Sequence, residues 1–431
     1  MPLPLLSRIA VDVTPLRESR DLRLLMGGEA ITGLGTQAAL VALPYQLYVE
    51  THSAFLTGLL GAVELIPLMT MALLGGALAD RHDRRRLLLF DQIGLVIGAG
   101  ALAALAFIGS PPVIALYVLG AMVAGFGAVQ NVTTSSIVPN LVAPERLRAA
   151  LALNYGLGAL TMVVGPAIGG LLIGALGLGS AYLVDALSCL AIFAAVWAMS
   201  PQPPGGDVVE HEPVLQAIGE GLRFVRRNQA LMGSFAMDLV AMTFGMPRAL
   251  FPVLSVSVYH AGATGTGLLF AGVAAGATVA ALTTGWLAHT RRLGRVVILA
   301  VAAWGLAIAL AGLAGSLWVA AGLLALAGAA DSISAVCRSS INQSVTPDHL
   351  RGRMSSVFSL VVTSGPRLGD VESGSVAALG GVRFSVVSGG LACVAGVGVI
   401  MLAFPALLRY DHDEVLAAAG AAVVPREPAP V

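Results

Sequence analysis

The sequence predicts an all-α integral membrane protein with twelve transmembrane helices in two pseudo-symmetric six-helix bundles. Hydrophobic residues make up 57% of the 431 residues and charged residues only 11%, too few to cover a water-soluble surface of this size. The 24 basic residues are all arginine, and nearly all lie in alternate loops and the terminal segments. Two similar basic loops, at residues 75–86 and 285–295, each separate two apolar runs. This repetition indicates an internal duplication, which is typical of transporters.

Each apolar segment is long enough to cross a bilayer as a helix. The twelve predicted spans are 24–48, 54–79, 87–109, 112–135, 149–176, 180–199, 229–257, 266–288, 295–315, 317–337, 354–381 and 384–408. The predicted domains are a cytoplasmic N-terminal segment (1–23), a first six-helix bundle (24–199), a cytoplasmic linker with an amphipathic helix (200–228), a second bundle (229–408) and a disordered cytoplasmic tail (409–431).

The arginine distribution predicts the orientation of the chain in the membrane. With a cytoplasmic N-terminus, the inside loops receive fifteen arginines, whereas the outside loops receive only Arg383. Arg338 is counted among the inside-loop arginines, because the tenth span is predicted to end at residue 337. We therefore expect both termini in the cytoplasm and a multi-pass location in a bacterial cytoplasmic (inner) membrane.

The loop between the second and third predicted spans carries a family motif. It reads Gly76-x-Leu78-x-Asp80-Arg81-x-x-Arg84-Arg85, and together with two six-span halves and a central loop it resembles the major facilitator superfamily. The segments 144–148, 220–227 and 346–353 resemble the bacterial exporter branch that contains the enterobactin exporter and macrolide or multidrug efflux proteins. Asp83 stands where the superfamily loop usually has glycine, so the usual turn geometry is in doubt, although aspartate also tolerates turns.

The resemblance implies that this loop is a conformational switch, formed by Gly76, Asp80, Arg81, Arg84 and Arg85. In it, Asp80 would cap a neighbouring helix start and stabilise one of two alternating conformations, since a carboxylate near a helix N-terminus is favourable. The alternative is a loop that only sets topology, which would explain the arginines but requires no acid.

The fifth predicted span carries a second motif, Gly165-Pro166-Ala167-Ile168-Gly169-Gly170. It resembles the end of the antiporter motif of superfamily drug exporters. Pro166 lacks a backbone donor, and Gly165, Gly169 and Gly170 lack side-chain bulk, so the segment can bend and pack closely at an interface between halves. The alternative is ordinary close helix packing. The segment 365–370 of the eleventh span echoes the motif with two added charges.

Ionisable or amide side chains inside predicted spans are costly, so each is a candidate for proton or substrate binding. The candidates are Glu29, Gln37, Glu64, Gln130, Asn131, Asp238, Arg248, Asp331, Arg367 and Asp370. In the family, the first, fourth, seventh and tenth spans line the central cavity, where a desolvated carboxylate could carry a proton.

Structural roles are the alternatives for several of these charges. Arg367 and Asp370 are spaced to pair on one helix face, and Glu64 could pair with Arg248 or Arg367. Asp185 is expected near the membrane interface, and Asp91 is expected to pair with an arginine of the basic loop.

The sequence thus predicts a secondary transporter that exports an amphipathic small molecule, drug-like or a siderophore, by proton antiport and alternating access. A proton-coupled importer is one alternative, and a non-transporting membrane scaffold or membrane enzyme is another. No nucleotide-binding loop, nucleophile elbow or metal-ligand spacing is present in the sequence, so we expect no enzymatic activity, no metal and no cofactor besides the proton gradient. The expected partners are the substrate and the lipid bilayer, with no nucleic acid, and the expected state is a monomer.

Overall fold

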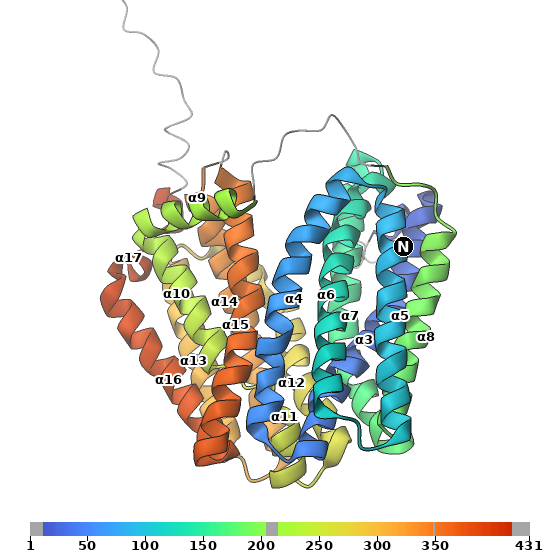
Figure 1. Ribbon diagram of the computed structural model, residues 1–431. Helices are drawn as coiled ribbons and strands as arrows, with labels where there is room; N and C mark the ends of the chain where they lie inside the picture. The colour runs from blue at the N-terminus through green and yellow to red at the C-terminus, as the bar shows by residue number, and fades with distance from the viewer. Residues whose placement is uncertain (1–11, 204–213, 348–349, 416–431) are drawn as a thin grey trace, which may run out of the picture. The chain divides into compact units, whose positions relative to one another are not determined.

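The computed structural model describes residues 12–203, 214–347 and 350–415, and within these ranges the chain is helical, without strands (Figure 1). Nine stretches of helix in the described ranges are long and apolar enough to cross a membrane. They include α4 (Ala54–Arg81), α5 (Arg84–Ile108), α6 (Val113–Ile137), α7 (Leu147–Leu176), α8 (Leu178–Trp197), α12 (Gly262–Thr283), α13 (Leu293–Leu313), α14 (Leu317–Val345) and α16 (Val382–Ala403). Three further helices lie where the first, seventh and eleventh spans are predicted: α3 (Arg20–Thr51), α10 (Gln229–Phe244) and α15 (Arg351–Gly380). The all-α transmembrane fold is confirmed, and the count of twelve stays a prediction.

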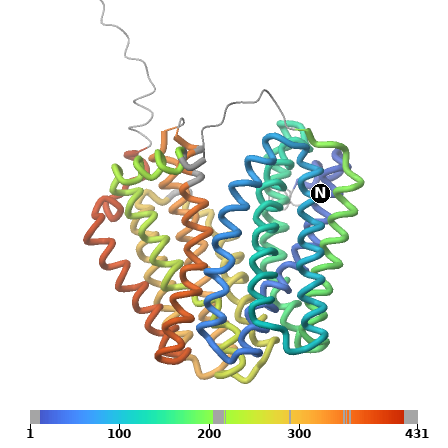
Figure 2. The backbone as a smooth tube through the Cα atoms, viewed as in Figure 1, coloured from blue at the N-terminus to red at the C-terminus, as the bar shows by residue number. Residues whose placement is uncertain are grey.

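The chain divides into two compact units whose boundaries differ from the predicted bundles. Unit 1 contains residues 1–210, 248–274 and 374–382, and unit 2 contains residues 211–247, 275–373 and 383–431. Unit 1 therefore includes two segments from the second half of the sequence. Figure 2 traces the chain as a smooth tube from the N-terminus in blue to the C-terminus in red.

The helices of unit 1 have clear local start and stop signals. Ser19 and Ser53 precede α3 and α4, and their side chains accept hydrogen bonds from Leu22 N (3.1 Å) and Leu56 N (3.3 Å). The helices α5 and α7 end at Gly109 and Gly177, both with φ above 80°, a conformation that a side chain would disfavour.

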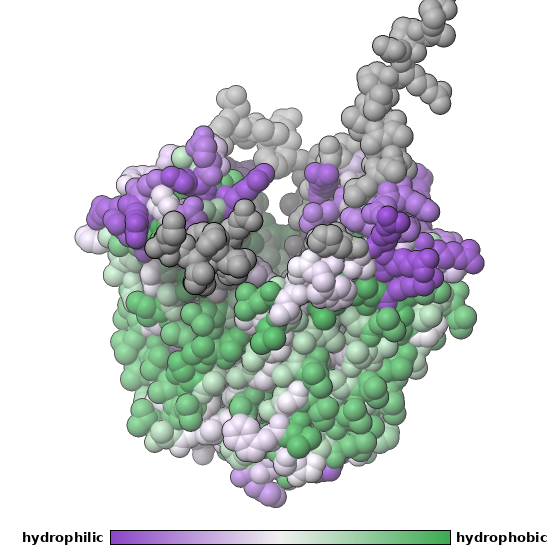
Figure 3. All heavy atoms as spheres, turned by 180° about the vertical axis from the view of Figure 1, so that it is seen from behind, coloured by the Kyte–Doolittle hydropathy of each residue, from purple (hydrophilic) through white to green (hydrophobic). Residues whose placement is uncertain are grey.

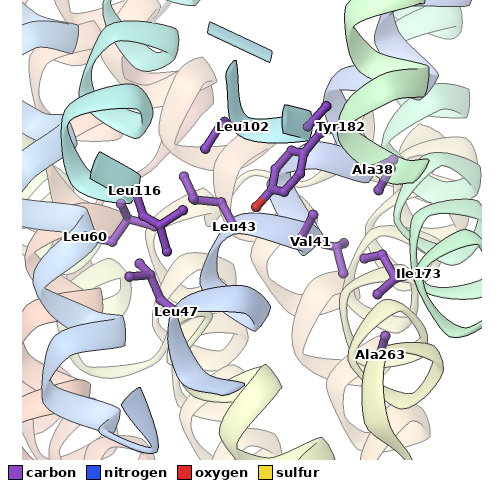
Figure 4. Close-up of a cluster of buried hydrophobic side chains, with 13 residues drawn as sticks. Ala38, Val41, Leu43, Leu47, Leu60, Leu102, Leu116, Ile173, Tyr182 and Ala263 are labelled. Atoms are coloured by element: carbon purple, nitrogen blue, oxygen red, sulfur yellow. The ribbon is translucent and has the colours of Figure 1, made fainter. Parts of the chain in front are cut away.

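The core of unit 1 is an apolar cluster to which α3 contributes most. Figure 4 shows Val41, Leu43 and Leu47 of α3 among side chains from α4 to α8 and from α12. Tyr182 of α8 is fully buried there, and its hydroxyl donates a 2.8 Å hydrogen bond to Gln46 Oε1. This bond satisfies the one polar atom of an otherwise apolar ring.

In unit 2, the seventh predicted span is not one continuous helix. The helix α10 ends at Phe244, and the chain resumes as the short α11 (Leu250–Val253) and a π-helical turn at Leu254–Val258, both of which belong to unit 1. Gly245 and Pro247 interrupt the helix, and the indole N–H of Trp304 on α13 donates to Gly245 O at 2.8 Å. The expected span 229–257 was therefore wrong as a single helix, since glycine and proline break it and a tryptophan satisfies the freed carbonyl.

The linker helix α9 (Val214–Arg227) packs on unit 2. Val225 is buried against Met354 and Val357 of α15, and Arg353 pairs with Glu220 at 3.0 Å. At the other end of the unit's sequence, the short α17 (Pro405–Leu408) leads to Tyr410, which is buried, and to Asp413, which pairs with Arg291 at 2.6 Å. Residues 409–415, the start of the tail that was expected to be disordered (409–431), therefore have ordered contacts. The rest of that tail, residues 416–431, and the expected linker residues 204–213 lie outside the described ranges.

Hydrophobic side chains cover the flanks of the helices, whereas hydrophilic ones gather near the helix ends (Figure 3). Apolar residues such as Leu282, Leu379 and Leu402 are more than 80% exposed. An apolar exterior of this extent is stable in lipid and not in water.

Candidate transport sites

The most deeply buried charges of unit 2 form an ion triad between α10 and α14. Arg338 Nη2 lies 2.8 Å from Asp238 Oδ1 and 3.8 Å from Asp331 Oδ1. The side chains of Arg338 and Asp238 are 3% and 2% exposed, while that of Asp331 is 23% exposed. Arg338 Nη1 also donates to Ser334 Oγ at 3.0 Å. The triad joins two of the predicted candidates, Asp238 and Asp331, through Arg338, which was not predicted as a candidate.

Helix geometry explains why α14 can hold this set. Asp331, Ser334 and Arg338 are spaced i, i+3 and i+7, so all three lie on one face of the helix. The assignment of Arg338 to a cytoplasmic loop was wrong, because α14 continues eight residues beyond the predicted end of the span, to Val345. The heptad spacing from Asp331 was the sequence signal that could have found Arg338.

Unit 1 contains a contrasting group of buried acids around Glu29. Its carboxylate Oε1 accepts hydrogen bonds from Thr134 Oγ1 at 3.0 Å and from Gln130 Nε2 at 3.4 Å, both on α6. The structure therefore brings together Glu29 and Gln130, two of the predicted candidates. Asn131, the next residue on α6, is exposed and has no part in this group.

Two further acids of unit 1 are buried, contrary to expectation. Asp91 of α5 is fully buried, and neither of its carboxylate oxygens has a hydrogen-bond partner among the described residues, so the expected pairing with a loop arginine was wrong. Asp185 of α8 is 3% exposed and accepts a 3.3 Å hydrogen bond from Thr36 on α3, so its expected interfacial position was also wrong. Both acids lie on helix faces that are buried inside the bundle.

The remaining candidates with charged or amide side chains are partly buried. Glu64 lies in α4, and its Oε1 would lie 3.9 Å from a Cβ atom placed on Gly120 of α6. Gln37 lies in α3 and its side chain packs against Gly165 of α7. Arg248 stands in the break that follows α10, while Arg367 and Asp370 lie in α15. These placements leave both the structural pairings and the transport roles of Glu64, Arg248, Arg367 and Asp370 as predictions.

The basic loop between α4 and α5 is held by its arginines and by Asp83. Arg84 Nε donates to Ala79 O at the end of α4 (3.2 Å), and Arg85 donates to Val196 O (3.0 Å) and Trp197 O at the end of α8. Cations at helix C-termini satisfy free carbonyls and complement the helix dipole. These two arginines therefore have a structural contact in addition to any effect on topology.

Asp83, the departure from the family motif, is the N-cap of α5. Its Oδ1 accepts from Arg85 N (2.9 Å), Arg86 N (3.3 Å) and Gln202 N (3.3 Å), and so ties the loop to the segment after α8. An aspartate at this position is a good cap and leaves the turn intact. The doubt about turn geometry is thereby answered.

Asp80 and Arg81 are exposed at the end of α4, and Gly76 lies one turn earlier, near Val132 of α6. Within the described residues, the Asp80 carboxylate has no hydrogen-bond or ion-pair partner. Its role as a conformational switch stays a prediction.

The glycine motif on α7 faces two different neighbours in unit 1. Gly165 packs against the Gln37 side chain of α3, and a Cβ at Gly169 would lie 2.6 Å from Ala38 Cα. A Cβ at Gly170 would lie only 2.9 Å from Gly267 Cα on α12, a helix from the second half of the sequence. The helix α7 is continuous through Pro166. Small residues thus permit close backbone approach on both faces.

A second contact of this kind lies between α4 and α15. A Cβ at Gly374 would lie 2.9 Å from Gly58 Cα and 2.7 Å from Ala54 O. Both glycine contacts are near helix ends that the arginine distribution predicts to lie outside the cytoplasm. Segments from the second half of the sequence therefore pack on unit 1 through glycines.

The sequence matches the transmembrane secretion effector family over residues 11–420, which is nearly the entire chain. The chain belongs to this family of the major facilitator superfamily. Family membership makes the protein a multi-pass membrane transporter and not an enzyme. It also confirms the resemblance drawn from the basic-loop motif and the two six-span halves.

Relatives and solved structures agree with this assignment. The chain is 28% identical over 364 residues to the enterobactin exporter EntS of Citrobacter koseri, covering 84% of this chain and 85% of that protein. It is 29% identical over 371 residues to EntS of Shigella boydii, covering 85% and 86%. A bacterial homologue of the iron transporter ferroportin in an inward-facing state matches with a TM-score of 0.67 and 19% identity, covering 89% of this chain and 98% of that one. The nucleoside transporter NupG matches with a TM-score of 0.70 and 14% identity, covering 91% and 100%. At these identities the structural matches show the fold alone.

Proposed function

We propose that this transporter exports an amphipathic small molecule, with siderophores as the first class to test, and that proton antiport drives export. The substrate proposal is supported by the similarity to enterobactin exporters, which spans about 85% of both chains. The proposed location is the bacterial cytoplasmic membrane, with both termini in the cytoplasm, because the arginine-rich loops all lie on one side. The proposed state is a monomer.

The ion triad of unit 2 is the single observation that carries the proton proposal. Two carboxylates and one guanidinium leave an excess of one negative charge when neither acid is protonated. An uncompensated charge in the interior of a membrane protein is unfavourable, so the triad has a place for one proton. Asp331 is the partly exposed member and lies farther from Arg338, so it is the acid that exchanges this proton with water.

Proton exchange at the triad gives a physical basis for coupling. With Asp331 protonated, Arg338 pairs with Asp238 alone and the triad is neutral. When Asp331 loses its proton, both acids compete for one guanidinium, which changes the forces between α10 and α14. The two helices would thereby respond to the proton gradient, as alternating access requires.

The glycine contacts of unit 1 supply the element that opens and closes. Gly170 with Gly267 and Gly58 with Gly374 join segments from the two sequence halves near the predicted outer ends of their helices. Backbones that meet through glycines bury little side-chain area, so they can separate without leaving large voids. We assign these contacts to the outer gate, closed in this conformation.

Transport into inverted proteoliposomes tests the proposal directly. Purified protein is reconstituted, a pH gradient is imposed with the interior acidic, and uptake of a labelled catecholate siderophore and of a cationic dye is followed. Export by antiport predicts uptake of one probe that collapses with an uncoupler. Asp331→Asn should abolish the gradient dependence while retaining exchange of labelled for unlabelled substrate, and Glu145→Gln, an exposed loop acid, is the matched control.

Each other outcome contradicts a stated part of the proposal. Uptake of a probe in the opposite gradient would make the protein an importer. Normal gradient dependence in Asp331→Asn would remove the triad as the coupling site. No gradient-dependent movement of either probe by a correctly folded protein would overturn both the substrate class and the antiport.

A further inference from the structure

The inner face of the linker helix α9 fits closely against α15 of unit 2. A Cβ atom at Gly221 would lie 2.7 Å from Val357 Cγ2 and 2.9 Å from Arg353 O, so a side chain at this position would force the two helices apart. Glu220 pairs with Arg353 at 3.0 Å, and Val225 is only 2% exposed. Backbone, ionic and apolar contacts together fix the position of α9 on the unit.

These contacts also set the depth of α9 relative to the membrane. Val225 belongs to one apolar cluster with Leu231 and Phe235 of α10 and with Met354 and Val357 of α15, all in the first two turns of those helices. Two helical turns rise about 11 Å, and the headgroup layer on each side of a bilayer is about 5–8 Å thick. Because α10 and α15 lie where spans are predicted, their first turns pass through this layer, and α9 lies beside them at the same level.

The direction of α9 agrees with a position along the membrane surface. The helix ends at Arg227, and Asn228 then has an extended backbone, with φ of −118° and ψ of 110°, and caps α10 through its side chain. The chain therefore turns sharply between the two helices. Figure 1 shows α9 running across the direction of α10 and α15. An amphipathic helix in this orientation is typical of a membrane interface.

The outer face of α9 consists of Leu222, Arg223, Arg226 and Arg227, all of which are exposed. Their spacings of three and four residues place them side by side along the helix. Within the described residues, none of the three arginines forms an ion pair. Glu220 is the one acid in the sequence of α9, and it is already paired with α15. The outer face therefore presents three positive charges and one apolar side chain at the level of the headgroups.

We propose that the outer face of α9 binds the headgroups of anionic phospholipids. Guanidinium groups bind phosphate oxygens through paired hydrogen bonds, and their aliphatic stems, together with Leu222, can lie against the apolar edge of the headgroup layer. The N-terminal end of α10 begins two residues after Arg227 and adds the positive end of a helix dipole. Each arginine near an anionic surface strengthens binding about fivefold, so the three together contribute about 100-fold.

Two alternatives give the arginines a different role. In the first, they only set the topology of the chain, a role that ends once the helices are inserted. In the second, the acids of the preceding linker sequence, Asp207, Glu210 and Glu212, neutralise them. Both alternatives predict that the folded protein does not respond to the charge of the lipid, whereas headgroup binding predicts that it does.

The full-length protein in lipid nanodiscs, without substrate, tests the site. A spin label is attached to a cysteine introduced at Gly219, an exposed position of α9 with open space around its Cβ position. The three native cysteines are buried and are not expected to react. Phosphatidylglycerol then replaces phosphatidylcholine in steps. The label should lose mobility as the anionic fraction rises, and added salt should weaken the effect because exposed charges are screened.

Removal of the three arginines should abolish this response. The triple variant Arg223→Gln, Arg226→Gln and Arg227→Gln is expected to bind about 100-fold more weakly, and Arg226→Gln alone about fivefold more weakly. In pure phosphatidylcholine the triple variant should unfold at the same temperature as the wild type, since these side chains have no partner among the described residues. A lower unfolding temperature there would assign the arginines a structural role and overturn the proposal.

A matched control removes the same charge from another exposed part of the chain. The variant Arg17→Gln, Arg20→Gln and Arg23→Gln lies in unit 1 and should leave the response of the label unchanged. An equal loss of response in this control would show a general effect of net charge and contradict a site on α9.

A further arm separates lipid headgroups from a free anion. Inorganic phosphate added to the protein in pure phosphatidylcholine should have no effect on the label, and an equal loss of mobility would replace the lipid site with a site for a soluble anion. No response of the wild type to phosphatidylglycerol, or an unchanged response in the triple variant on α9, would also overturn the inference. None of these measurements involves transport, so their outcome is independent of the proposed substrate and of proton coupling.

Discussion

The Arg338 guanidinium lies 2.8 Å from the Asp238 carboxylate, and both side chains are almost completely buried between α10 and α14. The two residues are 100 positions apart in the sequence. Either charge by itself would be unfavourable in the interior of a membrane protein. Together with Asp331, the two side chains form a cluster in which the charges are partly neutralised.

Removing one member of this pair should be far more damaging than removing both charges. Arg338→Gln leaves the buried Asp238 carboxylate without its cation, which is expected to cost about 3–5 kcal/mol, and Asp238→Asn leaves Arg338 only the more distant carboxylate of Asp331, at 3.8 Å. The double variant Asp238→Asn with Arg338→Gln should recover much of that loss. Thermal unfolding in detergent measures the effect, with Arg223→Gln on the exposed side of α9 as the control. Additive losses in the double variant would show that the two side chains are not energetically coupled.

Two aspartates in the same loop should respond oppositely to substitution. Asp83→Ala removes the α5 cap and the contact with Gln202, so it should lower stability by about 1 kcal/mol. Asp80→Asn removes an exposed carboxylate without a described partner, so it should leave stability unchanged and impair turnover. Unfolding temperature and the initial rate of substrate exchange are compared for both variants. Unchanged transport by a normally folded Asp80→Asn would discard the conformational-switch role.

Bulk introduced at the α7 contact with α12 should keep the proposed outer gate from closing. Gly170→Val places a side chain against Gly267 and Ala263 O, where even a Cβ would lie within 2.9 Å. Labelling of a cysteine introduced near the outer end of α7 should become faster, and transport should fall. Gly156→Val is the control, because no neighbouring atom lies within 4 Å of that position. Equal labelling rates in both variants would contradict the gate assignment.

The N-terminal segment should detach from unit 1 in acid. Arg146 pairs with Glu18 at 2.9 Å and with Asp12 at 3.9 Å, and hydrogen bonding to Thr14 holds the pKa of Asp12 below its usual value of 3.8. Because the folded-state pKa is lowered, the contribution of Asp12 is present above pH 3.8 and is lost as the pH falls through the lower folded value. A spin label at residue 17 should gain mobility below about pH 4. In Asp12→Asn part of this gain should already be present at pH 7, and an identical pH profile in the two proteins would refute the contact.

The sequence was sufficient for the helices and for much of the candidate set, because long apolar runs and arginine-rich loops are local signals. The sequence did not predict contacts between side chains that are far apart along the chain. The pairing of Arg338 with Asp238 requires α10 and α14 to pack side by side, and no local sequence pattern predicts which helices are neighbours. Asp91 follows a basic loop closely, so a loop arginine was the natural partner, yet its helix face turns it into the bundle. The break at Gly245 and Pro247 was, by contrast, visible in the sequence as a glycine and a proline two residues apart.

The division into two units has a consequence for any attempt to take the protein apart. The chain passes between the units five times, after residues 210, 247, 274, 373 and 382, so neither unit is one continuous stretch. Cutting the linker would break only the first of these connections. A fragment that stops before the linker would lack residues 248–274 and 374–382, and with them the partners that cover Gly58 and Gly170. The two halves of the sequence are thus not independent modules, and split or swapped versions must exchange the segments 248–274 and 374–382 along with the rest of unit 1.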